Sequence, residues 1–178
     1  YTIKAYPADG SEPILADDGE IFSYYVGPSA PPAWSQEAVV YQIFPDRFYP
    51  GDGRSWNKTQ TLNDIFGGTL RGIIQKLDYV PEMGFNTIWI NPFFPDDSHH
   101  GNHATDYFSV NPRLGTMDDI RELVTTAHSK GIRLLLDFVA NHWGSEHHSF
   151  QEAVRDPNSP FVNWYHWIDY PQDYETFF

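Results

Sequence analysis

The stretch "GIRLLLDFVANHWG", residues 131–144, decides the fold. Its first half is a short, continuous apolar run, which is typical of a strand buried on both faces of a parallel sheet. The run nevertheless contains the ionisable Asp137 and finishes on Asn141 and His142. Polar side chains at the carboxyl end of a buried strand indicate a functional site at that edge of the sheet.

Two earlier runs of the same kind, "VVYQIF" at 39–44 and "TIWI" at 87–90, lie upstream. A helical pattern separates each run from the next, so the predicted order is strand, helix, strand, helix, strand. Strands joined by helical crossovers must be parallel. The loops that follow the strands are long and those that follow the helices are short. The long loops therefore lie at the carboxyl ends of the strands, where parallel α/β folds build their functional sites.

The two helical patterns have recognisable ends. The first begins after the cap residue Thr69 and is closed by Pro81, and the second begins after Thr116 and ends at Lys130-Gly131. Apolar residues at helical spacing predict the buried stripes, which are Leu70, Ile73, Ile74 and Leu77 in the first helix and Ile120, Leu123, Val124 and Ala127 in the second.

Composition excludes several classes of function. The chain has 178 residues, enough for one domain or for part of a larger one, and a net charge of -13. Its 11 Lys and Arg are scattered among 24 Asp and Glu, which excludes a nucleic-acid partner. No stretch is apolar enough to span a bilayer, so no membrane partner is expected. Without cysteine there are neither disulfides nor thiolate metal sites, and the compartment stays open.

Aromatic residues are unusually frequent, at 17% of the chain. Their faces suit the apolar faces of sugar rings, but a large hydrophobic core explains the same number. The composition alone therefore does not decide between the two interpretations.

Residues 1–33 show a different pattern from the rest. Their alternating residues are broken by turns at Asp9-Gly10 and 17–19, which predicts short antiparallel strands, and "PSAPPAW" at 28–34 is typical of a linker. We expect residues 1–33 to be the tail of an N-terminal β-sandwich domain with its linker.

Asp137 is the residue whose position needs an explanation. Alternation along the strand puts it on one face with Leu135 and Val139, and in a closed barrel that face points into the mouth, where a carboxylate can bind Arg, Tyr or ligand hydroxyls. His142 is then a loop residue over the same mouth. A buried Asp that anchors a loop, with a His that caps a chain end, explains the residues equally well.

Other chemistries have less support. Five histidines in loops invite a metal hypothesis, but their spacing fits no standard zinc pattern; they are His99, His100, His103, His147 and His148. No Gly-rich phosphate loop follows a strand, as a nucleotide-binding, doubly wound sheet would need. No Gly-x-Ser-x-Gly elbow is present for a serine hydrolase.

Four motifs together resemble one enzyme family. They are "AVVYQIFPDRF", "GFNTIWINPFF", "HGNHATDYFSVNPRLGT" and "GIRLLLDFVANHWG", and they look like the first three barrel strands of the α-amylase family of glycoside hydrolases, in the expected order. The segment "GSEHHSFQEAVRDPNSPFVNWYHW" further resembles the neopullulanase and cyclomaltodextrinase branch. The resemblance implies an α/β fold: the N-terminal portion of a (β/α)8 TIM barrel, with strands one to three in 34–145 and the start of an inserted domain in 146–178.

The resemblance also implies an activity, the retaining hydrolysis or transfer of α-glucosidic bonds in starch-type oligosaccharides, maltodextrins or cyclodextrins. Such enzymes use an Asp nucleophile and a Glu acid about 5 to 5.5 Å apart. In the family these come from the fourth and fifth strands, so no catalytic residue is expected in this chain. By resemblance, His142 would bind the sugar, Asp137 would hold the polar network, and Asn141 would ligate a calcium ion or fix the inserted domain. His100 and Asn102 are also expected among the substrate-binding residues.

Two departures from the family bear on specificity and metal binding. A Tyr commonly follows His-Gly and stacks on the reacting sugar, whereas this chain has His100, Gly101 and Asn102, so Tyr107 or another residue would have to supply the platform. Where related enzymes carry a second, N-terminal calcium site, this chain has Thr69 and keeps only Asp52, so that site is expected to be weakened or absent.

The expected partners are an α-glucan oligosaccharide and the remaining part of the barrel, as a continuation or as a companion chain, since three strands cannot close a barrel. A homodimer is possible. The alternative function is a non-catalytic carbohydrate-binding or partner subunit of the same fold, which the missing Tyr favours. Substrate length and the choice between hydrolysis and transfer stay open.

Overall fold

The computed structural model describes residues 4–5, 7, 9–10, 12, 14–15 and 31–170. The chain divides into two compact units, 1–37 and 38–178. In the first unit, β1 (Lys4–Ala5) pairs with β2 (Ile14–Leu15) in antiparallel fashion, which confirms short antiparallel strands there. The rest of the predicted sandwich tail, 16–30, lies outside the described residues, so the sandwich and the domain bounds stay predictions.

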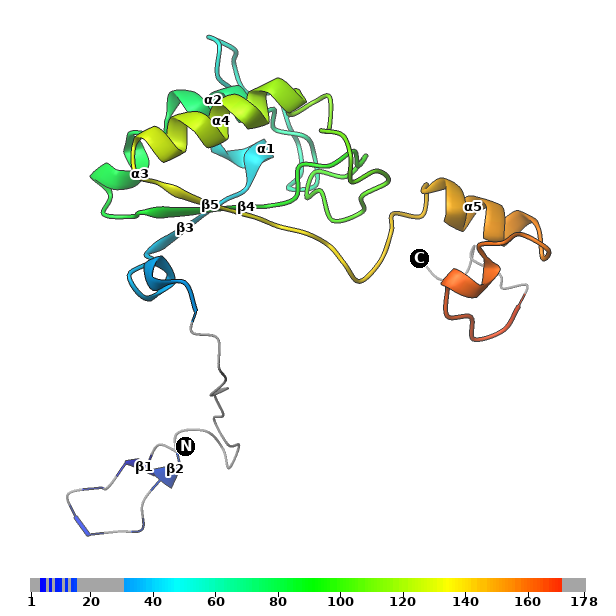
Figure 1. The fold of residues 1–178 in the computed structure, drawn as a ribbon, viewed down its shortest axis with the longest axis horizontal. Coiled ribbons are helices and arrows are strands. Elements are labelled where there is room, and N and C mark those ends of the chain that lie inside the picture. The colour runs from blue at the N-terminus through cyan, green and yellow to red at the C-terminus, as the bar shows by residue number, and fades with distance from the viewer. Residues whose placement is uncertain are drawn as a thin grey trace. The chain divides into compact units, whose positions relative to one another are not determined.

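The second unit is built on a parallel sheet with the strand order β3-β4-β5 (Figure 1). The strands are β3 (Val40–Ile43), β4 (Thr87–Ile90) and β5 (Arg133–Leu136), and each pairs with the next one along the chain. The sequence predicted all three. Asp137 was expected inside the third strand, which is wrong by one residue: β5 ends at Leu136, and the Asp137 N–H continues the ladder with a hydrogen bond of 3.0 Å to the Ile90 carbonyl.

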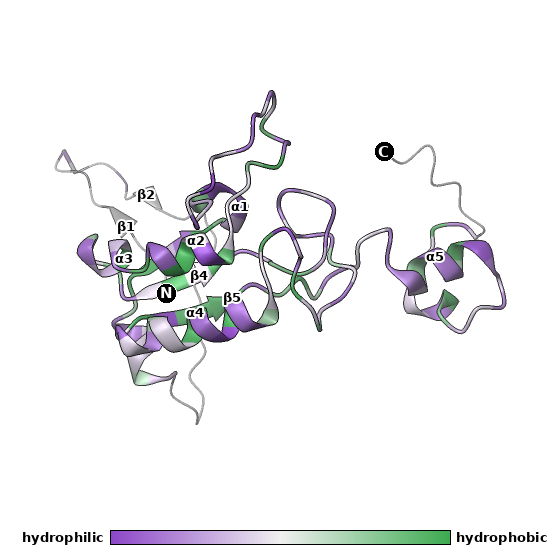
Figure 2. Ribbon diagram, turned by 90° about the horizontal axis from the view of Figure 1, so that it is seen from above, coloured by the Kyte–Doolittle hydropathy of each residue, from purple (hydrophilic) through white to green (hydrophobic). Residues whose placement is uncertain are grey.

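The helices α2 (Leu70–Gln75) and α4 (Met117–Ser129) lie side by side over one face of this sheet (Figure 1). They mix hydrophilic and hydrophobic residues, whereas β4 is coloured as hydrophobic (Figure 2). The shared core confirms the predicted helix stripes; its buried members are Ile43, Leu70, Ile73, Leu77, Val80, Ile88, Ile90, Phe93, Val110, Ile120, Leu123, Ala127 and Ile132.

The opposite face of the sheet is partly open. Val40, Trp89 and Leu135 are 41%, 40% and 38% exposed, although each is a large apolar residue. Gln42 lies in register with Trp89 and Leu135 on this face. A face of this kind buries its apolar side chains only when further protein packs against it.

The first predicted helix is not continuous. α2 ends at Gln75, and α3 (Tyr79–Glu82) starts after a turn in which the N–H of Val80 bonds to the carbonyl of Leu77, 3.2 Å away. Pro81 explains the break, because inside one helix its ring would clash with the carbonyl of Leu77. By restarting, the chain places Pro81 in the first turn of α3, where a missing N–H is tolerated.

The helix starts follow the predicted caps. The Thr69 side chain accepts a hydrogen bond from the Gly72 N–H at 3.1 Å. Thr116 forms a full capping box, in which its hydroxyl accepts from the Asp119 N–H at 3.2 Å and the Asp119 carboxylate accepts from the Thr116 N–H at 2.7 Å. These bonds satisfy N–H groups that a helix start leaves without partners.

The remaining elements were not predicted. They are the short α1 (Pro45–Phe48), α5 (His148–Arg155) and the 3-10 turns η1 (Ala33–Gln36) and η2 (Val162–Trp164). In the part of the chain that the structure describes, no helix is both long enough and apolar enough to cross a membrane.

Candidate functional site

The open face of the sheet ends in polar side chains. Gln42 in β3 donates a hydrogen bond of 2.8 Å from Nε2 to Oδ1 of Asn91, which directly follows β4. Asp137, which follows β5, is half-buried. Alternation from Leu135 places its side chain on the same face, as predicted from the sequence. The carboxyl ends of the three strands therefore form a polar edge on the face that α2 and α4 leave open.

His142 and Asn102 meet across this edge. The Nε2 atom of His142 lies 3.1 Å from the carbonyl oxygen of Asn102. Because a carbonyl oxygen only accepts, Nε2 must carry the proton, and Nδ1 is free to accept from the Asn141 amide nitrogen, 3.0 Å away. The structure thus brings together three of the predicted site residues, Asn102, Asn141 and His142, although Asn102 and His142 are 40 positions apart in the chain.

His100 extends the same group. Its Nδ1 accepts from the Asn102 N–H at 3.0 Å, and its ring centroid is 4.7 Å from that of His103, which in turn is 6.1 Å from that of His142. Burial and the nearby His103 lower the pKa of His100 below its usual value, against the opposing charge of Asp96. The imidazole rings of His100, His103 and His142 therefore form a row that joins the loop after β4 to the segment after β5.

Metal binding gains no support from this row. Among the described residues there is no group of three or more His, Cys, Asp or Glu side chains that could hold a metal ion. Among these residues the histidine metal hypothesis is therefore not supported. Calcium binding at Asn141 stays an untested prediction.

The predicted residues of the N-terminal calcium site contact the protein itself. Oδ1 of Asp52 accepts from Nε2 of Gln75 at 2.8 Å, and the Thr69 hydroxyl donates to the Pro50 carbonyl at 2.7 Å. The weakened or absent calcium site at this position stays a prediction.

Tyr107 is held tightly. Its hydroxyl donates to the carbonyl of Val139, and its ring lies 4.9, 4.7 and 4.8 Å from the rings of Phe94, Phe138 and Trp143. Burial raises the pKa of its phenol. These contacts join the loop after β4 to the segment after β5, and they favour a structural role; a role for Tyr107 as sugar platform stays a prediction.

A cavity of about 920 Å³ opens beside this tyrosine. Its walls come from the loop after β4, the segment after β5 and the region of α5 and η2. Its lining residues are Tyr107, Phe108, Phe138, Val139, Ala140, Asn141, His142, Trp143, Phe150, Trp164, Tyr165 and His166. Aromatic faces around a few polar groups suit a ligand with an apolar ring face and hydroxyl groups at its edge, such as a sugar.

Sequence reasoning missed most of these aromatic walls. Trp143, Phe150, Trp164 and Tyr165 were not predicted as site residues, although the density of aromatics in "FVNWYHW", 161–167, was a usable signal. It was ambiguous because a hydrophobic core has the same composition.

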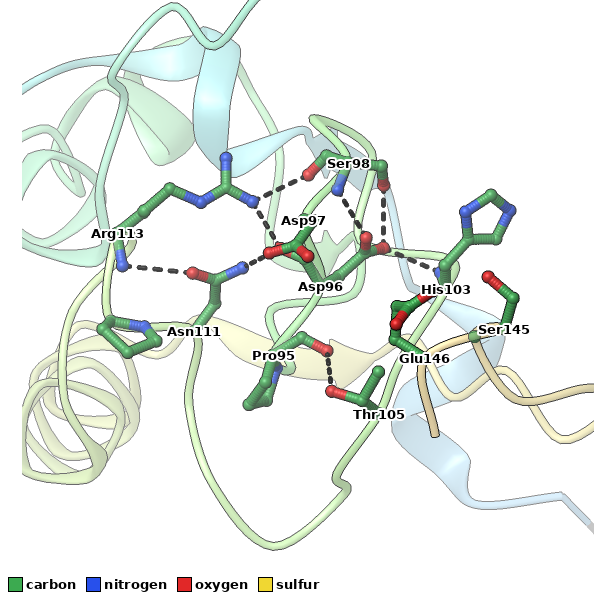
Figure 3. Close-up of a pocket in the computed structure, with 12 residues that line it drawn as sticks. Pro95, Asp96, Asp97, Ser98, His103, Thr105, Asn111, Arg113, Ser145 and Glu146 are labelled. Carbon is green, nitrogen blue, oxygen red and sulfur yellow. Dashed lines mark hydrogen bonds between the residues drawn. The ribbon is translucent and has the colours of Figure 1, made fainter. Parts of the chain in front are cut away.

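A second, polar cavity of about 450 Å³ lies against the loop after β4 and residues 144–146 (Figure 3). Asp96, Asn111 and Arg113 form one side of it, and their polar groups bond to one another and to the loop backbone (Figure 3). None of the three was predicted from the sequence.

Comparison with known proteins identifies the family of the chain. Residues 42–178 match the family description "Alpha amylase, catalytic domain". Alpha-amylase 2 of Dictyoglomus thermophilum is 44% identical over 147 residues, 83% of this chain and 26% of the relative. The cyclomaltodextrinase of Thermoanaerobacter pseudethanolicus is 36% identical over 148 residues, 79% of this chain and 26% of the relative. The chain thus spans about a quarter of the length of these curated relatives.

The solved structures agree in fold. The cyclic alpha-maltosyl-(1→6)-maltose hydrolase from Arthrobacter globiformis, in complex with cyclic alpha-maltosyl-(1→6)-maltose, superposes with a TM-score of 0.74 at 37% identity. The match covers 82% of this chain and 35% of that one.

Proposed function

The chain belongs to the α-amylase family of glycoside hydrolases, and we propose that it forms one wall of an active site that hydrolyses or transfers α-glucosidic bonds in maltodextrins or cyclodextrins. The observation that carries this proposal is the contact between His142 and Asn102. It shows a ring N–H at the strand ends that already binds an acceptor oxygen. A sugar hydroxyl presents an oxygen of the same kind, which would share this N–H with the Asn102 carbonyl in a three-centre hydrogen bond.

The barrel is the second part of the proposal. Val40, Trp89 and Leu135 line a half-exposed sheet face, which fits the interior of a (β/α)8 barrel whose other strands cover it. We propose that these strands come from a continuation of the polypeptide or from a companion chain. The N-terminal β1 and β2 would belong to a β-sandwich domain, and residues 146–178 would begin a domain inserted after β5.

The chemistry requires two carboxyl groups about 5 to 5.5 Å apart in a retaining enzyme, one to attack the anomeric carbon and one to protonate the leaving oxygen. We assign neither to this chain. Asp137 instead holds the polar network at the strand ends, and His142 binds the sugar beside the bond that is cleaved. Asn141 either ligates a calcium ion or fixes the inserted domain.

A second candidate is a non-catalytic carbohydrate-binding or partner subunit of the same fold. Asn102 favours it, because an amide replaces the aromatic platform expected after His100-Gly101 and the ring of Tyr107 is engaged by Phe94, Phe138 and Trp143.

Turnover separates the candidates. The 178-residue chain alone should not cleave maltoheptaose or β-cyclodextrin, whereas a protein that also contains the remaining strands should. In that protein His142→Ala should lower kcat/KM about 100-fold, a loss in the range of one lost transition-state hydrogen bond, and His128→Ala, on the exposed side of α4, should not. Turnover by the 178 residues alone would refute the assignment of both catalytic carboxylates to other strands.

Sugar binding without turnover by the full protein would establish the second candidate. Sedimentation would test the predicted homodimer.

A further inference from the structure

The loop between residues 95 and 105 is closed at its base. The Thr105 N–H donates to the Pro95 carbonyl at 3.0 Å, and the Thr105 hydroxyl reaches the same oxygen at 3.2 Å (Figure 3). The loop carries His100 and Asn102, so its shape decides where these two side chains lie relative to His142.

Asp96 lies inside the loop and binds it from both sides. Asp96 is 7% exposed, and its carboxylate accepts three hydrogen bonds. Oδ1 accepts from the Ser98 N–H at 2.6 Å, and Oδ2 accepts from the Ser98 hydroxyl at 2.8 Å and from the His103 N–H at 2.7 Å (Figure 3). One buried carboxylate therefore joins the start of the loop to its end.

The backbone of Asp96 is held as well. Its carbonyl accepts from Nδ2 of Asn111 at 2.8 Å and from the guanidinium of Arg113, which also donates to the Ser98 carbonyl at 2.9 Å (Figure 3). On the other side of the loop, the Gly144 N–H donates to the Ala104 carbonyl at 2.8 Å. Asp96 is thus fixed from behind while its carboxylate faces the loop.

A line of polar contacts runs from this carboxylate to the proposed sugar-binding imidazole. The Ser98 hydroxyl gives its one proton to Asp96, so its 3.2 Å approach to Nδ1 of His100 is a contact and not a hydrogen bond; that Nδ1 accepts from the Asn102 N–H. The Asn102 carbonyl then accepts from Nε2 of His142 at 3.1 Å. Each step depends on the loop conformation that Asp96 imposes.

We propose that Asp96 is a positioning residue, which acts through the 96–104 loop to hold the Asn102 carbonyl against His142 and so fixes the orientation and the Nε2-protonated form of that imidazole. The consequence for glucan binding rests on the proposed function, whereas the effect on the ring does not. Asp96 itself does not contact the sugar.

The ionisation of Asp96 agrees with this role. Burial disfavours the charged form, but the hydrogen bonds from Ser98 and from the His103 N–H outweigh it and lower the pKa of the carboxyl below its usual value. The group is therefore an acceptor for all three donors at neutral pH.

The first test observes the ring directly. In the complete protein labelled with ¹⁵N only in histidine, at about pH 8, where an unperturbed imidazole is neutral, the two ring nitrogens of His142 should show distinct shifts for a protonated Nε2 and an unprotonated Nδ1. Asp96→Ala should move both shifts toward the averaged values of a free imidazole. Asp97→Asn, which removes the charge of the adjacent residue, should leave the two His142 shifts unchanged. Unchanged shifts in a folded Asp96→Ala protein would overturn the proposal.

The second test asks whether Asp96 acts through His142. In the complete enzyme, Asp96→Ala should lower kcat/KM for maltoheptaose about tenfold in the wild-type background and less than about twofold in a His142→Ala background, because residues that act as a unit are not additive. Asp96→Asn, which keeps one acceptor oxygen, should lose less than Asp96→Ala. Equal losses in both backgrounds would show a general effect on the fold and overturn the proposal. A wild-type enzyme that cleaves no glucan would refute the proposed function, while the ring shifts would still decide the role of Asp96.

Discussion

The indole of Trp143 stacks on the imidazole of His147, with ring centroids 3.9 Å apart and planes 18° from parallel. His147 is buried, and its Nδ1 lies 2.7 Å from the Ser149 hydroxyl, which lies 2.6 Å from the hydroxyl of Tyr165. The same Nδ1 accepts from the Ser149 N–H at 3.3 Å and so caps α5. A neutral His147 therefore joins the segment after β5 to α5 and to the residues beyond it.

This arrangement predicts a pH-dependent stability of the α5 region. Burial and the neighbouring His148 lower the pKa of His147 below 6.5, against the opposing charge of Asp106. Since the unfolded chain binds the proton more readily, the stabilisation is complete above about pH 6.5 and is lost as the pH falls from there through the lower folded pKa. Hydrogen exchange of peptides from 143–166, corrected for the intrinsic rate, should become faster from pH 7 to pH 5.

The matched variants identify the residue responsible. His147→Gln should remove most of this pH dependence, and His128→Gln on α4 should leave it intact. An unchanged pH profile in His147→Gln would contradict the assignment.

The capping box of α4 should contribute measurably to stability. Thr116→Ala removes the hydroxyl that accepts from the Asp119 N–H and should lower the free energy of unfolding by about 1 kcal/mol. The control variant is Thr125→Ala, on the exposed side of the same helix, which should change the free energy of unfolding by less than about 0.5 kcal/mol. Urea unfolding of both variants measures the difference, and equal values would show that the cap contributes little.

Gly72 should resist replacement although it lies in a helix. Alanine has the higher helix propensity by about 1 kcal/mol, but a Cβ at this position would lie 1.8 Å from the carbonyl oxygen of Tyr49. We expect Gly72→Ala to cost about 3 kcal/mol, since backbone must move. Gly84 has a φ of +87° and open space around it, so Gly84→Ala should lower the free energy of unfolding by about 1 kcal/mol. Thermal unfolding that ranks Gly84→Ala as the more damaging change would be inconsistent with this packing.

Asp46, which lies in α1, should be the most sensitive carboxylate of the segment between β3 and α2. It is 3% exposed and accepts from the N–H groups of Phe66 and Gly67, each at 3.0 Å, and from Nε of Arg47 at 2.8 Å. Asp46→Ala leaves all three donors without this acceptor and should cost about 3 kcal/mol. The exposed Asp118 pairs with Arg121 at the surface, and its removal should cost less than about 0.5 kcal/mol. Similar unfolding midpoints for the two variants would argue against the role of Asp46.

The elements that the sequence predicted correctly are those in which local pattern and tertiary packing agree. Thr116 and Asp119 satisfy the start of α4 with groups only three residues apart, so the cap is written in a short stretch. The three strands likewise show as apolar runs because parallel strands are buried. The break after Gln75 was missed because the stripe of apolar residues continues through Leu77, and periodicity does not reveal where a proline forces the helix to restart.

The candidate site was predicted less completely, because its contacts join segments far apart in the chain. His142 and Asn102 were singled out separately, but their hydrogen bond depends on the shape of a loop that no periodicity encodes. Asp96 was overlooked for the same reason: in "FPDDS" it looks like one of two solvated acids, and only folding separates the buried Asp96 from the exposed Asp97.

The strand order β3-β4-β5 is also the order in which the strands leave the ribosome. β4 pairs with β3, and β5 pairs with β4, so each of these two strands adds to the one made just before it, and this part of the sheet can grow by one edge at a time during synthesis. The long loops, with His100, Asn102 and His142, are made between or after these pairing steps. Their contacts can therefore form on a sheet that is already in place.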